Sequence, residues 1–532
     1  MTNHAVYLCY DVKGIQQFIF SIPKLKYIVG ASLLIDNFDR SVKLRYPQNT
    51  VFTGGGRGIL FDGNNLKIDS IRRVLVESAR QYGLDLRIGV SKDFSEVVHC
   101  ADDLYPYVPD SLNGEPCRIS GLWPTTNGQG IHPLVEKRRE AAGRRNEENS
   151  FDQKILNDLK GKLPTKIQEH IEKLEFLSSV DAKDDDEKRG YYGAKALGDR
   201  NRWAVIALDG NDMGSQFQAF ERKHKKDSDE SKMKWYCRMS QDLDACTREA
   251  FYTGLAEAIT QWWENDYEKL HPKPNDCIVL PFRPLILGGD DILCLAHCSY
   301  AMDLAKTIIE NFDKLSEQRA SEASKNNIPD LWPGTGNRLS ISAGIAYTGV
   351  TLPLHTSIPY AESLLGSAKG KYRQERKENE PTPAAIDWEH ITESMLDTPT
   401  ARRNRDLRFI DDDLDGTEFC LTRKPYKVGD DLDKLLGQVK KLSDPKKYPR
   451  SLLVECRSLL AAPWSARIQR LAAMKKMNPN LVAMIAGKDF DDKPGSTWIE
   501  SMVNGKSVLT TTFVDIVDLL EEGHRMEQTT VE

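Results

Sequence analysis

Apolar and polar residues follow the same order in two separate blocks of the chain. In the first block, an apolar run at 5–12 closes near Asp11 and precedes a segment with apolar residues at helical spacing. Two short apolar runs within 50–61 flank three glycines, a pattern typical of a hairpin. A helix expected over 68–83 and a strand expected over 84–91 complete the order β-α-β-β-α-β of a ferredoxin-like unit.

The second block repeats this order. An apolar run that begins at 202 closes on Asp209, and two apolar runs within 284–296 flank a Gly-Gly-Asp-Asp turn. The elements expected after the turn are a helix over 300–318, a strand over 338–348 and a helix over 359–374. Two copies of one unit in a single chain predict an internal duplication.

The regions outside the two blocks differ in pattern. We expect an α+β protein in which two ferredoxin-like domains are joined by a charged, helical linker that includes an acidic stretch at 179–190. A mostly helical C-terminal domain with a polar tail follows. The expected boundaries are 1–110 and 201–388 for the two ferredoxin-like domains, 111–200 for the linker and 389–532 for the C-terminal domain.

Composition narrows the class of protein. With 532 residues, 40% of them hydrophobic, the chain can form more than one core, and its net charge of −6 provides no general attraction for nucleic acid. No apolar run approaches the ~18 residues of a membrane span, so we expect no membrane partner. Ten scattered cysteines without a C-x-x-C pair, and no signal peptide, predict reduced thiols in the cytoplasm.

Three carboxylates carry the predicted chemistry. Asp209 ends a strand that, in this topology, lies beside the hairpin that carries Asp290 and Asp291. Carboxylates packed this closely repel one another unless cations neutralise them, and their hard oxygens suit Mg²⁺ or Mn²⁺. Two such ions, about 3.5–4 Å apart, would serve phosphoryl transfer. We therefore expect Asp209, Asp290 and Asp291 to be the metal ligands and the catalytic residues.

Residues around the carboxylates are candidates for nucleotide binding. Gly288 and Gly289 allow the turn to be tight and let a nucleotide approach without a Cβ atom in the way. The turn after Asp209 is small and polar, and its N–H groups would hold a triphosphate at a helix start; it consists of Gly210, Asn211, Asp212, Met213, Gly214 and Ser215. Lys369, on a later helix, either reaches the phosphates or is a solvated lysine.

The first block differs from the second at the positions that correspond to the three carboxylates. Asp11 matches the strand-end carboxylate, but GGGRG, with Gly54, Gly55 and Gly56, replaces the Gly-Gly-Asp-Asp turn. This copy is not expected to hold two metal ions. Its glycine turn still allows close approach, so we expect it to bind a second, acceptor nucleotide; the alternative is a decayed copy kept only for packing.

The chain resembles the Cas10 family (Cmr2/Csm1), the large subunits of type III CRISPR effector complexes. The resemblance rests on DVKGIQQFIFSIPKLKYIVGAS near the start, LDGNDMGS, LILGGDDILCLA, SISAGIAYTGVTLPL and AESLLGSAK. In that family two palm domains pack face to face, and the GGDD palm polymerises ATP into cyclic oligoadenylate second messengers with divalent metal. The resemblance implies that the two ferredoxin-like domains are a degenerate first palm and a catalytic second palm.

Some family features are expected to be missing. Many members begin with an HD nuclease domain, whereas here the first palm starts near Met1 and no HD dipeptide precedes it, so we do not expect DNA cleavage. The family's four-cysteine zinc element is also not recognisable, and Cys117 is a candidate remnant. Asn211 occupies a position that is often acidic in the family.

The expected function is a metal-dependent nucleotidyltransferase that polymerises ATP into cyclic oligoadenylate in CRISPR-type antiviral defence. The alternatives are a catalytically silent RNA-binding scaffold of a type III complex and a GTP enzyme similar to diguanylate cyclases. The implied partners are ATP, guide and target RNA, small type III CRISPR subunits and a downstream effector that responds to the product. The basic stretch formed by Lys369, Lys371, Arg373, Arg376 and Lys377 fits an RNA contact and a solvated helix face about equally well.

Overall fold

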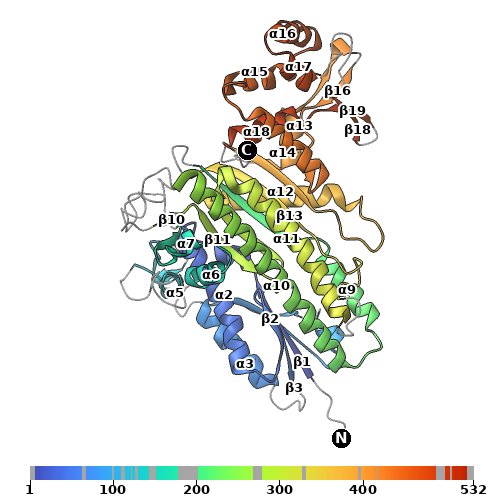
Figure 1. Ribbon diagram of the computed structural model, residues 1–532. Coiled ribbons are helices and arrows are strands. Elements are labelled where there is room, and N and C mark those ends of the chain that lie inside the picture. Colours follow the sequence, from blue (N-terminus) through green and yellow to red (C-terminus); the bar gives the residue numbers. More distant parts are fainter. Residues whose placement is uncertain are drawn as a thin grey trace.

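The structure is a computed structural model in which two sheets and their helices form the larger body, with a C-terminal part at one end (Figure 1). The described residues are 6–62, 68–98, 101–108, 114–121, 123–125, 130–142, 151–177, 202–267, 278–325, 331–392, 397–414, 416–486, 498–503 and 506–523. The acidic stretch predicted at 179–190 and the polar tail at 524–532 lie outside these residues.

The first sheet has five strands in the order β2-β3-β1-β4-β5, and all neighbouring strands are antiparallel. Its central strand is β1, and every side chain from Val6 to Tyr10 is buried, so the strand is covered on both faces. The strands are β1 (Val6–Lys13), β2 (Thr50–Gly54), β3 (Arg57–Asp62), β4 (Asp85–Ser91) and β5 (Asp103–Tyr105). The helices are α1 (Ile15–Phe20), α2 (Leu25–Arg45), α3 (Ile68–Tyr82) and α4 (Phe94–Val97).

The second sheet has six strands in the order β11-β12-β9-β13-β14-β17. Strand β14 is parallel to β13, while the other neighbours are antiparallel. The strands are β9 (Arg202–Gly210), β11 (Phe282–Gly288), β12 (Asp291–His297), β13 (Ile341–Gly349), β14 (Ala385–Ile391) and β17 (Tyr426–Lys427). The helices are α9 (Met213–Lys223), α10 (Asp229–Trp262, continued by a π-helical turn, Trp263–Tyr267), α11 (Cys298–Lys325) and α12 (Leu354–Arg373).

The two sheets are copies of one plan, as the sequence predicts. The first four strands of each sheet follow the same chain order and the same spatial order, with β9 in the place of β1 and the hairpin β11–β12 in the place of β2–β3. The copies also pack reciprocally. Tyr236 of α10 contacts Phe52 and Phe94 of the first unit, while α2 of the first unit packs against the second sheet beside Leu293 and Leu295. The fold is therefore the predicted pair of palm domains, packed on each other.

The segment between the sheets contains short elements. The described elements are β6 (Glu115–Pro116), β7 (Pro124–Thr125), α5 (Pro133–Ala141), α6 (Phe151–Lys160), α7 (Thr165–Gln168), a 3-10 turn (Ile171–Lys173) and β8 (Leu174–Phe176). Strand β8 pairs in parallel with β10 (Ile278–Leu280), which lies just before the second hairpin.

The C-terminal part is mostly helical, as predicted, and also contains a four-stranded sheet that the sequence analysis did not predict. The sheet has the order β15-β16-β19-β18. Its strands are β15 (Arg408–Asp411), β16 (Thr417–Cys420), β18 (Ile499–Val503) and β19 (Lys506–Thr510). The helices are α13 (Pro399–Asp406), α14 (Asp430–Leu442), α15 (Arg450–Leu460), α16 (Trp464–Met477), α17 (Pro479–Ala486) and α18 (Phe513–Glu521), with a 3-10 turn at Asp412–Leu414. Among the described residues, no helix is long and apolar enough to cross a membrane.

Candidate active site

The second sheet brings the three predicted aspartates together at one end of its central strands. Asp209 is the penultimate residue of β9, and β12 begins at Asp291, whose neighbour Ile292 pairs with Leu208. Asp290 lies in the two-residue turn that connects Gly288 to Asp291 across the hairpin. The sheet register thus places the hairpin turn directly beside the end of β9.

The charges of these carboxyl groups act on one another. The pKa of Asp290 is raised to about 7, first because its carboxyl group is surrounded by protein atoms and second because Asp209 is negatively charged. The same two causes raise the pKa of Asp291 to about 8. Desolvation and like charge both disfavour the ionised form, so this end of the sheet has a strong preference for a compensating cation.

Lys369 provides one such cation. Its Nζ atom donates a hydrogen bond to Oδ2 of Asp209 and another, of 2.8 Å, to the carbonyl oxygen of Gly210. Helix α12 carries this lysine to the aspartates because the helix lies directly on β13, the strand next to β9. Of the two alternatives for Lys369, the structure therefore supports a place within the site.

The turn after β9 approaches the carboxylates closely. A Cβ atom at Gly210 would lie 2.8 Å from Oδ2 of Asp290 and 2.6 Å from Cε of Met213, so a larger residue there would have to displace these side chains. Asp212, with φ of 60°, precedes α9; its carboxylate accepts a 3.0 Å hydrogen bond from the N–H of Thr382. A Cβ atom at Gly214 would meet nothing within 4 Å, so the start of α9 is open to a ligand.

A cavity of about 670 Å³ lies against these residues, within the size range of nucleotide and cofactor sites. Its lining combines acidic side chains with basic side chains of α12 and of the segment after it. The lining residues are Asp209, Gly210, Asp212, Met213, Gly214, Ser215, Asp290, Lys369, Arg373 and Arg376. This pairing of carboxylates with cations suits a metal-bound polyphosphate.

Not every predicted residue faces this cavity. Asn211 is buried and turns the other way: its Nδ2 atom donates to Oγ of Ser340 at 2.9 Å and to the carbonyl oxygen of Thr382 at 3.4 Å. Gly288, Gly289 and Asp291 are not among the cavity-lining residues, although Gly289 has the positive φ of 62° that the turn requires. A direct nucleotide contact by Asn211, Gly288 and Gly289 stays a prediction, as does metal binding by Asp291.

The glycine turn of the first copy is partly occupied by the protein itself. The N–H of Gly56 donates a 2.8 Å hydrogen bond to Asp39, and a Cβ atom there would lie 2.8 Å from the side chain of Ile15. Burial raises the pKa of Asp11, while the positive charge of Arg57 opposes that rise. Gly54 and Gly55 are less crowded, since a Cβ atom at Gly55 would meet nothing within 4 Å. An acceptor nucleotide at Asp11, Gly54, Gly55 and Gly56 remains a prediction.

The metal-binding prediction can be compared with the donors present. Three aspartate carboxylates offer the hard oxygen ligands that Mg²⁺ and Mn²⁺ prefer, and their mutual repulsion would be relieved by a divalent cation. Within the described part of the chain, however, no three acidic, histidine or cysteine side chains are arranged to hold an ion as they stand. Lys369 already holds Oδ2 of Asp209, so an ion at that oxygen would compete with the lysine.

Two cavity-lining cations were not assigned to the nucleotide site from the sequence. Arg373 and Arg376 were recognised only as members of a basic stretch. Their spacing from Lys369, four and seven residues along one helix and its end, puts all three on one face, and this periodicity was the available signal. Arg376 also pairs with Asp212 at 3.5 Å.

Comparison with known proteins gives one family match, over the part of the chain that contains this site, and several structural matches. Residues 202–378 match the model of the family described as Cas10/Cmr2, second palm domain, and no curated protein matches the chain. Among solved structures, a Csm1–Csm4 cassette in complex with cA4 aligns at 12% identity over 98% of this chain and 70% of that chain, with a TM-score of 0.47. Csm1 of T. onnurineus aligns at 14% identity over the same shares, with a TM-score of 0.48. The matched residues include the three aspartates and Lys369.

Proposed function

Since residues 202–378 match the family model of the Cas10/Cmr2 second palm domain, we propose that the chain is a metal-dependent nucleotidyltransferase that polymerises ATP into cyclic oligoadenylate. One observation carries the proposal. Asp209, Asp290, Lys369 and two arginines line one cavity of about 670 Å³, and Lys369 contacts Asp209 within it. Carboxylates for divalent cations and nearby cations for phosphates are what nucleotidyl transfer requires.

In this proposal, Asp209, Asp290 and Asp291 would hold Mg²⁺ or Mn²⁺. The ions, when bound, would lower the pKa of the acceptor's ribose hydroxyl and neutralise charge on the donor's phosphates. The carboxylates are committed to the ions, so no side chain is assigned as a general base.

The basic side chains in the cavity lining would orient the donor nucleotide. Lys369 would transfer its hydrogen bond from Asp209 to a phosphate oxygen, which frees the carboxylate for an ion. Arg373 would add a second positive charge one turn further along α12. Gly214, with open space around its Cα atom, would let the phosphate chain lie against the start of α9.

The wider setting follows from the family. We propose that the chain works in a type III CRISPR system, with guide and target RNA and small CRISPR subunits as partners and an effector that responds to the product. We retain the acceptor site at Asp11 and the glycine turn of the first copy as part of this proposal.

A second candidate function has one observation in its favour. Because no metal site is preformed among the described residues and Lys369 neutralises Asp209, the chain would also suit a catalytically silent, RNA-binding scaffold. The first candidate converts ATP, whereas the scaffold converts no nucleotide. The third alternative, an enzyme similar to diguanylate cyclases, would convert GTP.

The test is product formation by the purified chain with ATP or GTP, in Mg²⁺ or Mn²⁺, with and without guide and target RNA. We expect oligoadenylates and pyrophosphate from ATP, identified by mass. The double variant Asp290→Ala with Asp291→Ala should lose at least about a hundredfold in rate, since charge stabilisation at the reacting phosphate is lost.

The matched control replaces a pair of adjacent, exposed aspartates away from the cavity, Asp430→Ala with Asp431→Ala, at the start of α14. This variant should keep the rate of the natural chain. Equal pyrophosphate release from the Asp290/Asp291 variant and this control would reject the site. Tight RNA binding without turnover under any condition would favour the scaffold. Turnover of GTP but not of ATP would favour a GTP enzyme similar to diguanylate cyclases.

A further inference from the structure

A second hollow, of about 530 Å³, adjoins the candidate active site. Both cavities are lined by Ser215 and Arg376, so they meet along this line. The second hollow lies between α9 and the segments around 333–334 and 376–379. None of the three candidate metal ligands lines it.

The second hollow is basic. Arg222, Arg376 and Lys377 line it, against the single carboxylate of Glu378. Arg222 and Lys377 are exposed, and the only ion pair that Lys377 forms with a described residue is a loose contact of 3.8 Å with Glu380. These two charges are therefore accessible to an anion.

Arg376 stands at the boundary between the two cavities and is fixed there by the protein. Its guanidinium donates hydrogen bonds to the carbonyl oxygens of Glu380, at 3.0 Å, and Gly334, at 2.9 Å, and pairs with Asp212 at 3.5 Å. A guanidinium held in this way can face an anion on either side without losing side-chain entropy.

Gly334, which lines the second hollow, is held by Gln216. Gln216 is 1% exposed and lines neither cavity, and its Oε1 atom accepts a 3.1 Å hydrogen bond from the N–H of Gly334. The positive charges that the hollow offers to an anion are therefore those of Arg222, Arg376 and Lys377.

The proposed reaction releases such an anion. The acceptor's ribose oxygen forms a bond to the α-phosphorus of the donor, and the bond from this phosphorus to the oxygen that bridges to the β-phosphate breaks. That oxygen keeps the electron pair and leaves as part of pyrophosphate, while the hydroxyl proton passes to solvent. Ser215 and Arg376 line both cavities, so a phosphate chain whose α-phosphate lay at Asp209 and Asp290 would extend past them towards the second hollow.

We propose that the second hollow is a phosphate-chain site, formed by Arg222, Arg376 and Lys377, that takes the pyrophosphate produced at the adjoining active site. The proposal rests on the proposed function for the origin of the pyrophosphate, but not for the anion binding itself. The same chemistry would also hold the terminal phosphates of a bound nucleoside triphosphate, and kinetics separate these two sources.

The test uses the full chain and the double variant Arg222→Ala with Lys377→Ala, two residues that line only the second hollow. The control, Arg73→Ala with Lys314→Ala, removes the same charges from exposed positions of α3 and α11. In the first variant we expect the inhibition constant of pyrophosphate to rise about tenfold, because two charged contacts are lost. The KM for ATP stays unchanged if the site takes free pyrophosphate, and rises together with the inhibition constant if it holds the substrate's terminal phosphates.

Calorimetric titration with pyrophosphate measures the same site without turnover. If the natural chain makes no product, the proposed function fails, yet weaker pyrophosphate binding by the Arg222/Lys377 variant than by the control still supports the phosphate-chain site. Equal inhibition constants and equal pyrophosphate affinities in the two variants would overturn it. Loss of single-stranded RNA binding with unchanged pyrophosphate binding would also overturn it, and would assign the hollow to RNA.

Discussion

At the scale of single residues, Lys369 connects the two halves of the candidate site. Its ammonium group contacts both a candidate metal ligand, Asp209, and the backbone of the turn that we propose for phosphate binding. Side-chain exposures of 19% for Lys369 and 35% for Asp209 leave this pair accessible from the cavity. A partly exposed ion pair contributes little to stability, so its value is expected to lie in the reaction.

We predict that Lys369→Met lowers kcat/KM for ATP by about 10- to 100-fold, the usual range for a lost charged hydrogen bond. Most of the change should appear in KM, because the lysine would contact the phosphates of the bound substrate before the reaction. Steady-state kinetics measure this, and Lys314→Met, an exposed lysine of α11, is the control. A KM for ATP equal to that of the control would remove Lys369 from the phosphate site.

The positions of some site residues could be predicted from the sequence, and those of others could not. Asp209 and the Asp290–Asp291 pair follow from their positions at strand ends, since strand pairing alone brings them together. The orientation of Asn211 does not follow, because it depends on Ser340 and Thr382, which are distant in the sequence. Arg376 is placed by backbone carbonyls of two loops, and no side-chain pattern encodes such contacts.

At the scale of elements, the position of α12 depends on one glycine of β13. A Cβ atom at Gly344 would lie 2.1 Å from the carbonyl oxygen of Ala361 and 2.3 Å from the backbone nitrogen of Leu365. The helix can therefore lie directly on the strand, and Lys369 follows Leu365 by one turn. The close contact of helix and strand is what brings the lysine to Asp209.

We predict that Gly344→Ala displaces α12, lowers the free energy of unfolding by about 1–3 kcal/mol and reduces ATP turnover beyond the loss of folded protein. Chemical denaturation and the KM for ATP measure the two effects. The control is Gly366→Ala on the same helix, where a Cβ atom would meet nothing within 4 Å, so stability should stay equal or rise. Equal KM values for both variants would show that α12 does not set the position of Lys369.

Elements were predictable where their pairing is local or their periodicity is long. The hairpins β2–β3 and β11–β12 and the long helix α11 belong to this class. The sheet β15-β16-β19-β18 does not, since its strands have four or five residues and β16 pairs with β19, which lies far along the chain. Such short segments carry too little periodicity to be distinguished from turns.

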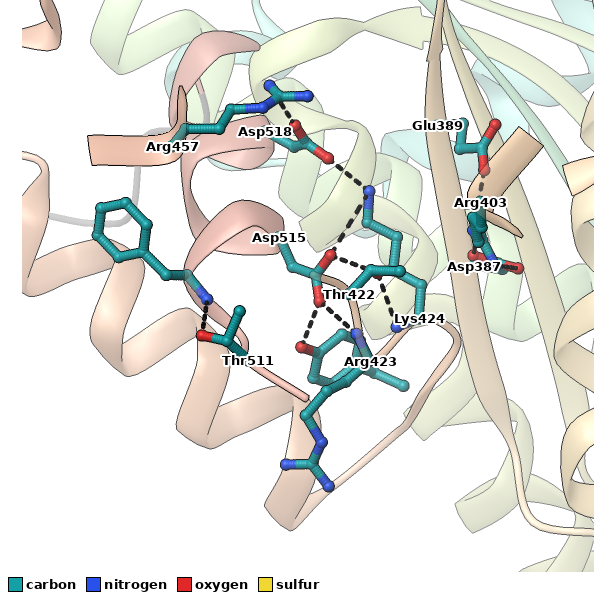
Figure 2. A network of polar contacts seen from close by, with 12 residues as sticks. Asp387, Glu389, Arg403, Thr422, Arg423, Lys424, Arg457, Thr511, Asp515 and Asp518 are labelled. Carbon is teal, nitrogen blue, oxygen red and sulfur yellow. Dashed lines mark hydrogen bonds and ion pairs between the residues drawn. The ribbon is translucent and has the colours of Figure 1, made fainter. Parts of the chain in front are cut away.

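At the scale of the whole molecule, a buried polar network joins the second palm domain to the C-terminal part (Figure 2). Asp515 of α18 accepts hydrogen bonds from Oγ1 of Thr422, at 2.6 Å, and from the hydroxyl of Tyr426, at 2.7 Å. Lys424 donates to Asp518 at 2.6 Å and lies over the ring of Trp388, a residue of β14. The network therefore connects α18 with the edge of the sheet that carries the active site.

Loss of the lysine from this network should weaken the attachment of the C-terminal part to the catalytic domain. Lys424 has a side-chain exposure of 2%, so Lys424→Met leaves Asp515 and Asp518 without their buried cation, although Arg457 still contacts Asp518 at 2.8 Å. We predict a loss of about 3 kcal/mol in the free energy of unfolding, as for other broken buried pairs. Lys234→Met, which breaks an exposed pair with Glu230, should change the denaturation midpoint little. If the two variants unfold at the same denaturant concentration, the network is not a structural joint, and the catalytic domain is held to α18 by apolar packing alone.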